Sequence, residues 1–352
     1  MAIIDKPSDY FNTVLYTGNG SSGHAITGVG FQPDFLWLKP RSTTGYHRVF
    51  DVVRGAGKQI YPNETNQENT DTNQMSAFNS DGFTLGNETG SNANGTTFVA
   101  WNWKAGTSFT NDASSTGIGT IDSTGSVNTD AGVSIVSFTG TGSNGTIKHG
   151  LSTKPSMVII KRRDSANDWR VGSDGLTNWT KHVNLNTEAA QSDLASAFNS
   201  TAPTSSVFSV GTSISVNASG GTYIAYCFAS INGYSKIGET YTGNGNANGP
   251  FIYTGFKPAF ILLKNTERVI NWEMLDNKRP STGQNPADDI LFPNTSDAES
   301  SSQTDRLVDF VSNGIKIRGT SLQMNASGQK FIYMAFAENP FVASNFNAAT
   351  AR

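Results

Sequence analysis

The sequence predicts an all-β protein built of three tandem antiparallel β-sandwich repeats of jelly-roll or lectin-like type. Two observations lead to this prediction. Short apolar runs alternate with stretches rich in Gly, Asn, Ser and Thr, which are the usual turn residues between strands. A set of motifs also returns three times along the 352 residues with the same internal spacing, which is the signature of a repeated structural unit.

Each repeat opens with an aromatic residue followed by T-G-x-G, and an apolar run ends in a lysine 23 residues after that aromatic residue. An N-A-x-G motif comes later, and a second apolar run opens six residues after its asparagine. These landmarks are Tyr16, Lys39 and Asn92, then Phe138, Lys161 and Asn217, then Tyr241, Lys264 and Asn325. The run before each lysine predicts a strand buried on both faces, entered through a proline at Pro33, Pro155 or Pro258.

The second apolar run predicts the closing strand of each sandwich. In the first repeat its alternate residues are Val99, Trp101 and Trp103, and the corresponding residues of the other repeats are also large and apolar. Because alternate residues of a strand point to the same face, this face is expected to lie against a core. The opposite face is mostly apolar too, so we expect it to be covered as well.

The repeat boundaries are placed at residues 1–106, 107–234 and 235–342, with a C-terminal tail at 343–352. Residues 107–131 have the composition of a linker. Ile118, Ile121 and Val127 nevertheless indicate an edge strand there, so this stretch is assigned to the second repeat. The stretch at 187–198 is the one place where the sequence suggests a helix.

The glycines after Tyr16 spell G-x-G-x-x-G at Gly18, Gly20 and Gly23, the pattern of a dinucleotide-binding turn. Such a turn must open a helix whose N-terminus holds the pyrophosphate. Here it is followed by H-A-I-T-G-V-G-F-Q-P, which has no helical period. The glycines are therefore interpreted as a strand-ending turn that recurs because the repeat recurs.

Composition excludes several functional classes. The net charge is −3 with no dense basic block, so no nucleic-acid partner is expected. No apolar run approaches the length of a membrane span, and no signal peptide is expected because the first residues carry charge where such a peptide is apolar. Synthesis in a reducing cytosol is expected. Cys227 is the single cysteine, and the histidines show no H-x-x-x-H spacing, so neither a disulfide within the chain nor a metal or cofactor is predicted.

Two sets of residues are candidates for a functional role. Eight residues after the lysine of each repeat stand His47, Trp169 and Trp272, which either stack on sugar rings as exposed ligand-binding aromatics or cover the edge of the core. Twelve and fifteen residues after the lysine stand an aspartate and an arginine in the first and third repeats. We interpret these as structural staples, in which a bidentate pair fixes a turn, rather than as a ligand site. The two pairs are Asp51 with Arg54 and Asp276 with Arg279.

No catalytic residue is predicted. A glycosidase needs two carboxylates facing one bond, and the acidic residues in the polar stretch 63–71 are not distinguished from those of an ordinary loop. The Asp- and Asn-rich loops leave calcium binding open, although the usual calcium-loop pattern is missing.

The stretch from Gly233 to Lys264, G-Y-S-K-I-G-E-T-Y-T-G-N-G-N-A-N-G-P-F-I-Y-T-G-F-K-P-A-F-I-L-L-K, resembles a repeat domain of structural proteins of marine tailed bacteriophages. The resemblance continues through W-E-M-L-D-N-K-R-P, N-A-S-G-Q-K-F-I-Y-M-A-F-A-E-N-P-F and, in the first repeat, R-V-F-D-V-V-R-G and V-A-W-N-W-K-A-G. It covers nearly the whole chain, with the second repeat the most divergent.

This resemblance implies a non-enzymatic protein of the virion surface with a lectin-like sandwich fold, of the tail fibre or tail spike type, which contributes to host attachment. The implied partners are other virion proteins and host surface glycans, with the chain forming a homo-oligomer on the particle. Three alternatives stay open: a head decoration protein that stabilises the capsid, a carbohydrate-binding module and a polysaccharide depolymerase.

Overall fold

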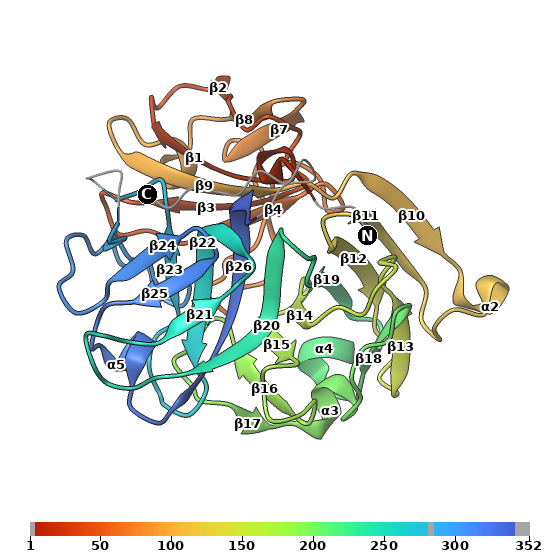
Figure 1. Ribbon diagram of the computed structural model, residues 1–352. Coiled ribbons are helices and arrows are strands. Elements are labelled where there is room, and N and C mark those ends of the chain that lie inside the picture. Colours follow the sequence, from red (N-terminus) through yellow and green to blue (C-terminus); the bar gives the residue numbers. More distant parts are fainter. Residues whose placement is uncertain (1–3, 281–284, 342–352) are drawn as a thin grey trace.

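The chain folds mostly into antiparallel β-sheet, as the computed structural model shows for residues 4–280 and 285–341 (Figure 1). The prediction of the all-β class is confirmed. The expected C-terminal tail at 343–352 lies outside the described residues. Within the described residues, no helix is long and apolar enough to cross a bilayer.

Three four-stranded arrangements, called here the main sheets, share one strand order. We call residues 4–106, 107–234 and 235–341 the first, second and third segments. The main sheets are β1 (Phe11–Thr17), β9 (Thr97–Trp103), β3 (Phe35–Pro40) and β4 (Arg48–Asp51); β12 (Val133–Thr139), β19 (Thr222–Phe228), β14 (Met157–Arg162) and β15 (Arg170–Ser173); and β20 (Ser235–Thr242), β26 (Lys330–Pro340), β22 (Phe256–Asn265) and β23 (Glu273–Asp276).

The strands that contain the landmark lysines are buried along their whole length or nearly so, which confirms that both of their faces are covered. Two of the prolines precede their strands, but Pro258 lies inside β22. There the register with β26 shifts on both sides of the proline. A proline has no N–H to give to the ladder, and an irregularity of this kind accommodates it.

A smaller sheet lies over one face of each main sheet. The smaller sheets are β2 (His24–Ile26), β8 (Gly82–Leu85) and β7 (Met75–Asn79); β13 (Gly145–Lys148) and β18 (Val207–Val210); and β21 (Phe251–Tyr253), β25 (Gly314–Ile317) and β24 (Val308–Val311). In the first segment, Leu36 and Leu38 of the main sheet pack with Phe83 and Leu85 of the smaller sheet in one core. Each segment therefore has two layers of sheet.

The remaining elements are short. The second main sheet is extended at one edge by β10 (Thr107–Asn111) and β11 (Ser123–Asn128), which fall in the stretch of linker-like composition, and at the other by β16 (Lys181–Asn184) and β17 (Ser192–Asp193). The first segment also has β5 (Lys58–Gln59) and β6 (Asn69–Thr70). The helices have a single turn each: η1 (Pro7–Asp9), α1 (Thr89–Asn92), α2 (Ala113–Thr116), α3 (Ala195–Phe198), α4 (Ile214–Asn217) and α5 (Leu322–Asn325).

The helix expected at 187–198 is mostly wrong, since only its last turn, α3, is helical. Residues 192–193 instead form β17, which pairs with β16 at the edge of the second main sheet. The weak helical pattern of this stretch is overridden because its backbone finds strand partners in the folded protein.

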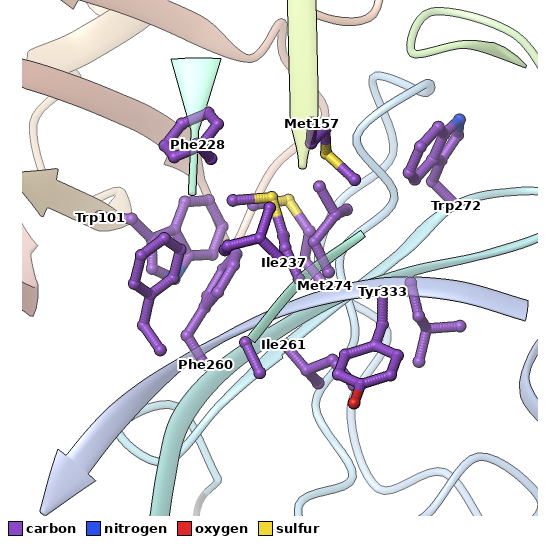
Figure 2. Packing of buried hydrophobic residues seen from close by; sticks show 14 of the residues in the cluster. Trp101, Met157, Phe228, Ile237, Phe260, Ile261, Trp272, Met274 and Tyr333 are labelled. Atoms are coloured by element: carbon purple, nitrogen blue, oxygen red, sulfur yellow. The ribbon is translucent and has the colours of Figure 1, made fainter. Parts of the chain in front are cut away.

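The second face of each main sheet packs into one core shared by all three segments. Val99, Trp101 and Trp103 belong to this shared core, as the alternation in the sequence predicted, while Phe98 and Ala100 face the core of the first segment. Figure 2 shows residues of different segments meeting there, among them Trp101, Phe228 and Phe260.

At the centre of the shared core, one aromatic residue from each segment meets the other two. The ring centroids of Trp103 and Phe228 lie 6.5 Å apart, those of Phe228 and Phe336 6.2 Å, and those of Trp103 and Phe336 5.6 Å. All three residues are at most 1% exposed. The closing strands thus converge on a common aromatic cluster, so no segment completes its core alone.

The turn after each opening aromatic residue is held by the asparagine of the N-A-x-G motif. Asn325 accepts from the N–H of Asn244 at 2.8 Å and donates to the carbonyl oxygens of Asn246 and Gly319, both at 2.8 Å. Asn92 and Asn217 make the corresponding contacts in their segments. The turn is therefore anchored to the end of a helical turn and is a structural element.

The glycines of this turn are required by close backbone contacts. A Cβ atom on Gly18, Gly140 or Gly243 would lie 2.2, 2.4 or 2.3 Å from the carbonyl oxygen of the alanine in the N-A-x-G motif. Such a distance is far below van der Waals contact, so only glycine fits. The same packing constraint in all three segments explains why the glycine motif recurs.

Replacing Asn325 with Ala is expected to lower the free energy of unfolding by about 2–3 kcal/mol, because several buried backbone groups lose their only side-chain partner. Denaturant titration followed by tryptophan fluorescence measures this change. Asn246→Ala is the control, since the Asn246 side chain is exposed and makes only a local contact. Equal stabilities of the two variants would contradict the anchoring role of Asn325.

Candidate functional site

The three candidate aromatic residues lie at the contacts between segments. The Nε1–H group of Trp169 donates to the carbonyl oxygen of Tyr61 in the first segment, at 2.9 Å. That of Trp272 donates to the carbonyl oxygen of Asn184 in the second segment, also at 2.9 Å. We call the contacts between consecutive segments the 1–2 and 2–3 junctions, and the contact between the third and first segments the 3–1 junction.

His47 has the same role at the 3–1 junction. Its Nδ1 atom accepts from Trp37 Nε1 at 2.9 Å, so the ring proton is on Nε2, which lies 3.0 Å from the carbonyl oxygen of Phe292. Burial lowers the pKa of His47 well below its usual value, and the neutral ring fits this pair of contacts.

His47, Trp169 and Trp272 are 0%, 1% and 1% exposed. A sugar ring stacks on an aromatic residue only if one ring face is open, so the sugar-stacking interpretation of these three residues is wrong. The other interpretation, that they cover the edge of the core, agrees with their burial. The sequence showed that these residues share one spacing from the lysine. It did not show that a neighbouring segment covers them.

The landmark lysines form a second set of contacts across the same junctions. Lys39 Nζ donates to the carbonyl oxygen of Asp297 at 2.7 Å, and Lys161 Nζ donates to that of Thr65 at 3.0 Å. Lys264 Nζ donates to the carbonyl oxygen of Glu188 at 2.9 Å. Each lysine also reaches a carbonyl oxygen of its own segment. The amino groups therefore join neighbouring segments.

All three lysine side chains are buried. Burial lowers the pKa of Lys39 to about 7 and the pKa of Lys161 and of Lys264 to about 8. No carboxylate is hydrogen-bonded to these amino groups among the described residues. Their donors are instead used by backbone oxygen atoms of two segments at once.

Lys264→Met is expected to lower the free energy of unfolding by about 1–3 kcal/mol, because buried carbonyl oxygen atoms lose their donor while the apolar stem is kept. Thermal and denaturant unfolding at pH 7 measure the change. Lys236→Met is the matched control, since the Lys236 side chain is 34% exposed and its nearest carboxylate, that of Glu239, is 3.6 Å away. A loss of stability as large in the control would contradict the assigned contact.

The Asp–Arg pairs lie at two of the three junctions. Arg54 Nε donates to Asp51 Oδ2 at 2.6 Å, and the Arg54 N–H donates to Asp51 Oδ1 at 2.9 Å, as a staple requires. Across the 1–2 junction the Tyr226 hydroxyl group donates to Asp51 Oδ2 at 2.7 Å. Glu68 contacts Arg54 and accepts two hydrogen bonds from Arg163 of the second segment.

The 3–1 junction repeats this network with different residues. Arg279 Nε donates to Asp276 Oδ2 at 2.6 Å, and Trp101 Nε1 donates to the same carboxylate at 2.9 Å. Glu299 binds Arg279 at 2.8 Å and is held by Arg41 of the first segment. Both staples therefore also fix one segment to the next.

The 2–3 junction lacks these charges. Sheet register places Ser173 where Asp51 and Asp276 stand, and Met334 where Tyr226 and Trp101 stand. Leu176 stands in the place of the arginine, fifteen residues after the lysine. The backbone contact that Glu68 and Glu299 make across their junctions is made here by Gln191, whose N–H donates to the carbonyl oxygen of Thr266 at 2.8 Å.

Sequence spacing did not reveal the junction carboxylates Glu68 and Glu299, nor Asn63, Asn186 and Asn294, which accept from the N–H groups of the three buried aromatic residues. These residues lie in loops of different length, so their separation from the lysine varies between segments. These residues occupy equivalent positions in the folded segments, but their separations from the lysine along the chain differ.

Three other side chains that can titrate are buried within their own segments. Cys227 is buried, and burial raises the pKa of its thiol. Burial also lowers the pKa of His149 and His182 to about 4. No group of three or more His, Cys, Asp or Glu residues suited to a metal ion occurs in the described part of the chain.

Comparison with known proteins gives one family match. The model of a domain of unknown function (DUF7483) matches residues 6–340, which covers all three main sheets and all three junctions. A search of curated proteins gives no match to the chain.

Proposed function

Since the chain belongs to the DUF7483 family across residues 6–340, we propose that this family member is a non-enzymatic virion surface protein of a tailed bacteriophage, built as three β-sandwich repeats closed around a pseudo-threefold axis. Each repeat is of jelly-roll or lectin-like type. The repeats correspond to residues 1–106, 107–234 and 235–342.

The observation that carries this proposal is the use made of the recurring residues. The lysines, the buried aromatic residues and the asparagines of the N-A-x-G motif occupy equivalent places in all three segments, and each contacts backbone groups. The hydrogen bonds of these residues join the three segments and make the folded protein rigid. A rigid body that presents long polar loops is suited to adhesion, where many weak contacts add up when many copies share one particle.

The assignment to a virion rests on the resemblance to repeats of marine phage structural proteins. We infer a tail appendage of fibre or spike type that contributes to host attachment, made in the host cytoplasm and assembled with other virion proteins, with itself as a homo-oligomer, and in contact with host glycans. The second candidate is a head decoration protein. The closure of all three segments around one core favours this candidate, because a fibre usually needs an elongated shaft.

Gold-labelled antibodies on intact particles of the source phage test the proposal. Label at the tail or its fibres is the expected result. Label spread over the head would replace the attachment role with capsid decoration. The assignment to the virion would be contradicted if the chain is produced during infection but the particles carry no label.

An enzymatic role has its own test. Incubation of the purified chain with host envelope polysaccharide should release no reducing sugar if the protein is non-enzymatic. Release that is abolished by replacing one acidic residue would instead identify a polysaccharide depolymerase.

A further inference from the structure

A cleft of about 390 Å³ opens at the 2–3 junction. Its lining comes from both segments and includes Leu176 and Gln191 of the second segment and Thr266 of the third. These are the residues that stand in place of the arginines and glutamates of the other two junctions. The cleft therefore lies where the 1–2 and 3–1 junctions hold a network of charged side chains.

The replacements at this junction act together. The 1–2 junction has two guanidinium groups, those of Arg54 and Arg163, and the carboxylate of Glu68. At the 2–3 junction Leu176 takes the place of Arg54, Thr266 that of Arg163 and Gln191 that of Glu68. None of these three side chains is charged. Loss of a single member of a buried charge network would leave its partner unpaired, at a cost of several kcal/mol. Replacement of all members leaves space without an unpaired charge.

Backbone features shape one wall of the cleft. Gly175 lies in its wall, and a Cβ atom there would be 2.5 Å from the carbonyl oxygen of Gly238. Gly238 has a φ of 66° and sits at a register shift between β20 and β26, which is a β-bulge. Bulges often redirect side chains beside binding sites. Here the bulge brings Glu239 and Thr240 into the lining.

The lining is rich in groups that bind neutral hydroxyl groups. Hydroxyl and amide side chains come from Ser156, Thr177, Gln191 and Thr240. Thr266 is buried below them, and its hydroxyl group donates to the carbonyl oxygen of Lys330 at 3.1 Å. Gln191 Oε1 lies 3.2 Å from the N–H and 3.3 Å from the hydroxyl group of Thr177 and accepts from both. No described residue accepts from its NH₂ group, which is left to donate to an oxygen atom of a ligand.

The charged groups of the cleft are balanced. Asp174 is paired with Lys154 at 2.7 Å, Glu239 lies 3.6 Å from Lys236, and Lys330 adds a positive charge to the lining. A strongly charged ligand would therefore meet groups of both signs. Carboxylates next to hydroxyl and amide groups suit a ligand that has many hydroxyl donors and no net charge.

We propose that the cleft at the 2–3 junction binds a neutral saccharide unit, through Gln191, Thr240 and the carboxylates of Asp174 and Glu239. The inference deepens the proposed attachment function by placing glycan recognition at one junction of the three. It uses residues other than the buried aromatics first considered for sugar binding.

Saturation-transfer difference NMR on the full chain tests this inference, with glucose, galactose, mannose, N-acetylglucosamine and maltotriose as probes. At least one probe is expected to bind, and Gln191→Leu combined with Thr240→Val should weaken its binding at least tenfold. Thr201→Val is the matched control, because Thr201 is exposed and outside the cleft. The control should bind like the parent protein.

A filled cleft gives an independent variant. Ser173→Asp with Leu176→Arg introduces the pair found at the other junctions and should abolish binding, with folding checked by circular dichroism. Gln191→Leu alone is the alternative if the filled variant does not fold. Absence of binding to all five sugars, or binding unchanged in the cleft variants, would overturn the inference. Virion labelling is unaffected by either result, so failure of this site and failure of the proposed function are distinguishable.

Discussion

Replacing Asp51 with Ala is expected to lower the free energy of unfolding by about 3–5 kcal/mol, because the guanidinium group of Arg54 is then buried without its carboxylate. Both side chains are fully buried. The Tyr226 hydroxyl group also loses its acceptor across the 1–2 junction. Urea titration at pH 7, followed by circular dichroism, measures the change.

The chain itself supplies a compensating variant. Asp51→Ser, Arg54→Leu and Tyr226→Met together copy the side chains found at the 2–3 junction, namely Ser173, Leu176 and Met334. Replacing both members of a buried ion pair by uncharged residues is often close to neutral, and Glu68 keeps its partner Arg163. The triple variant is therefore expected to recover at least half of the loss. A triple variant as unstable as Asp51→Ala would show that the unpaired charge is not the cause.

The second large effect concerns Glu273, and it depends on pH. This carboxylate is fully buried without a hydrogen bond among the described residues, and Arg306 Nε is 3.7 Å from Oε1. Burial raises the pKa of Glu273 to about 8, more than the charge of Arg306 lowers it, and Asp305 adds to the increase. The positions nine residues after the lysine in the other segments hold Arg48 and Arg170 instead.

Because the pKa of Glu273 is higher in the folded state than in the unfolded state, the folded protein holds a proton that the unfolded chain releases. The stabilising contribution is complete below about pH 4.5 and is lost as the pH rises to about 8. Glu273→Gln imitates the protonated side chain and removes this loss. At about 1.4 kcal/mol per pKa unit, the variant should exceed the parent protein by about 3–5 kcal/mol above pH 8.

Unfolding free energies of parent and variant between pH 5 and 9 provide the test, since the difference between the two should increase with pH. The buried lysines contribute equally to both proteins and cancel in this difference. Glu239→Gln is the control, because its side chain is 50% exposed. A difference that stays constant from pH 5 to 9 would show that Glu273 does not titrate in this range.

Local sequence patterns predicted the strands and their faces well. The run before Lys161 is buried on both faces, and the alternation at Trp101 separates two cores. Such patterns report which side of a strand is apolar, because burial of that side is the main stabilising force. They do not report which part of the chain covers it. The shared core and the contact of Trp169 with Tyr61 therefore appear only in the folded structure.

The candidate site shows the same limit. Spacing identified Asp51 and Arg54 as a pair, because a turn places residues three apart within reach of each other. The sequence also showed that Leu176 replaces the arginine in the second segment. That Gln191 and Thr266 take the places of a glutamate and a second arginine is evident only from contacts between distant loops. The cleft follows from this combination, so no single stretch of sequence contains the signal for it.

The shared core has a consequence for synthesis. The contact between Lys39 and Asp297 joins residues 258 positions apart. Trp103 packs against Phe336, so its side chain is not fully buried until the third segment has been synthesised. At about 5–20 residues per second, the ribosome needs several seconds to release the third segment after the second. During that interval the nascent chain exposes two apolar sheet faces to the cytosol. A chain truncated after residue 234 should therefore aggregate or stay bound to chaperones, rather than fold into a soluble protein of two segments.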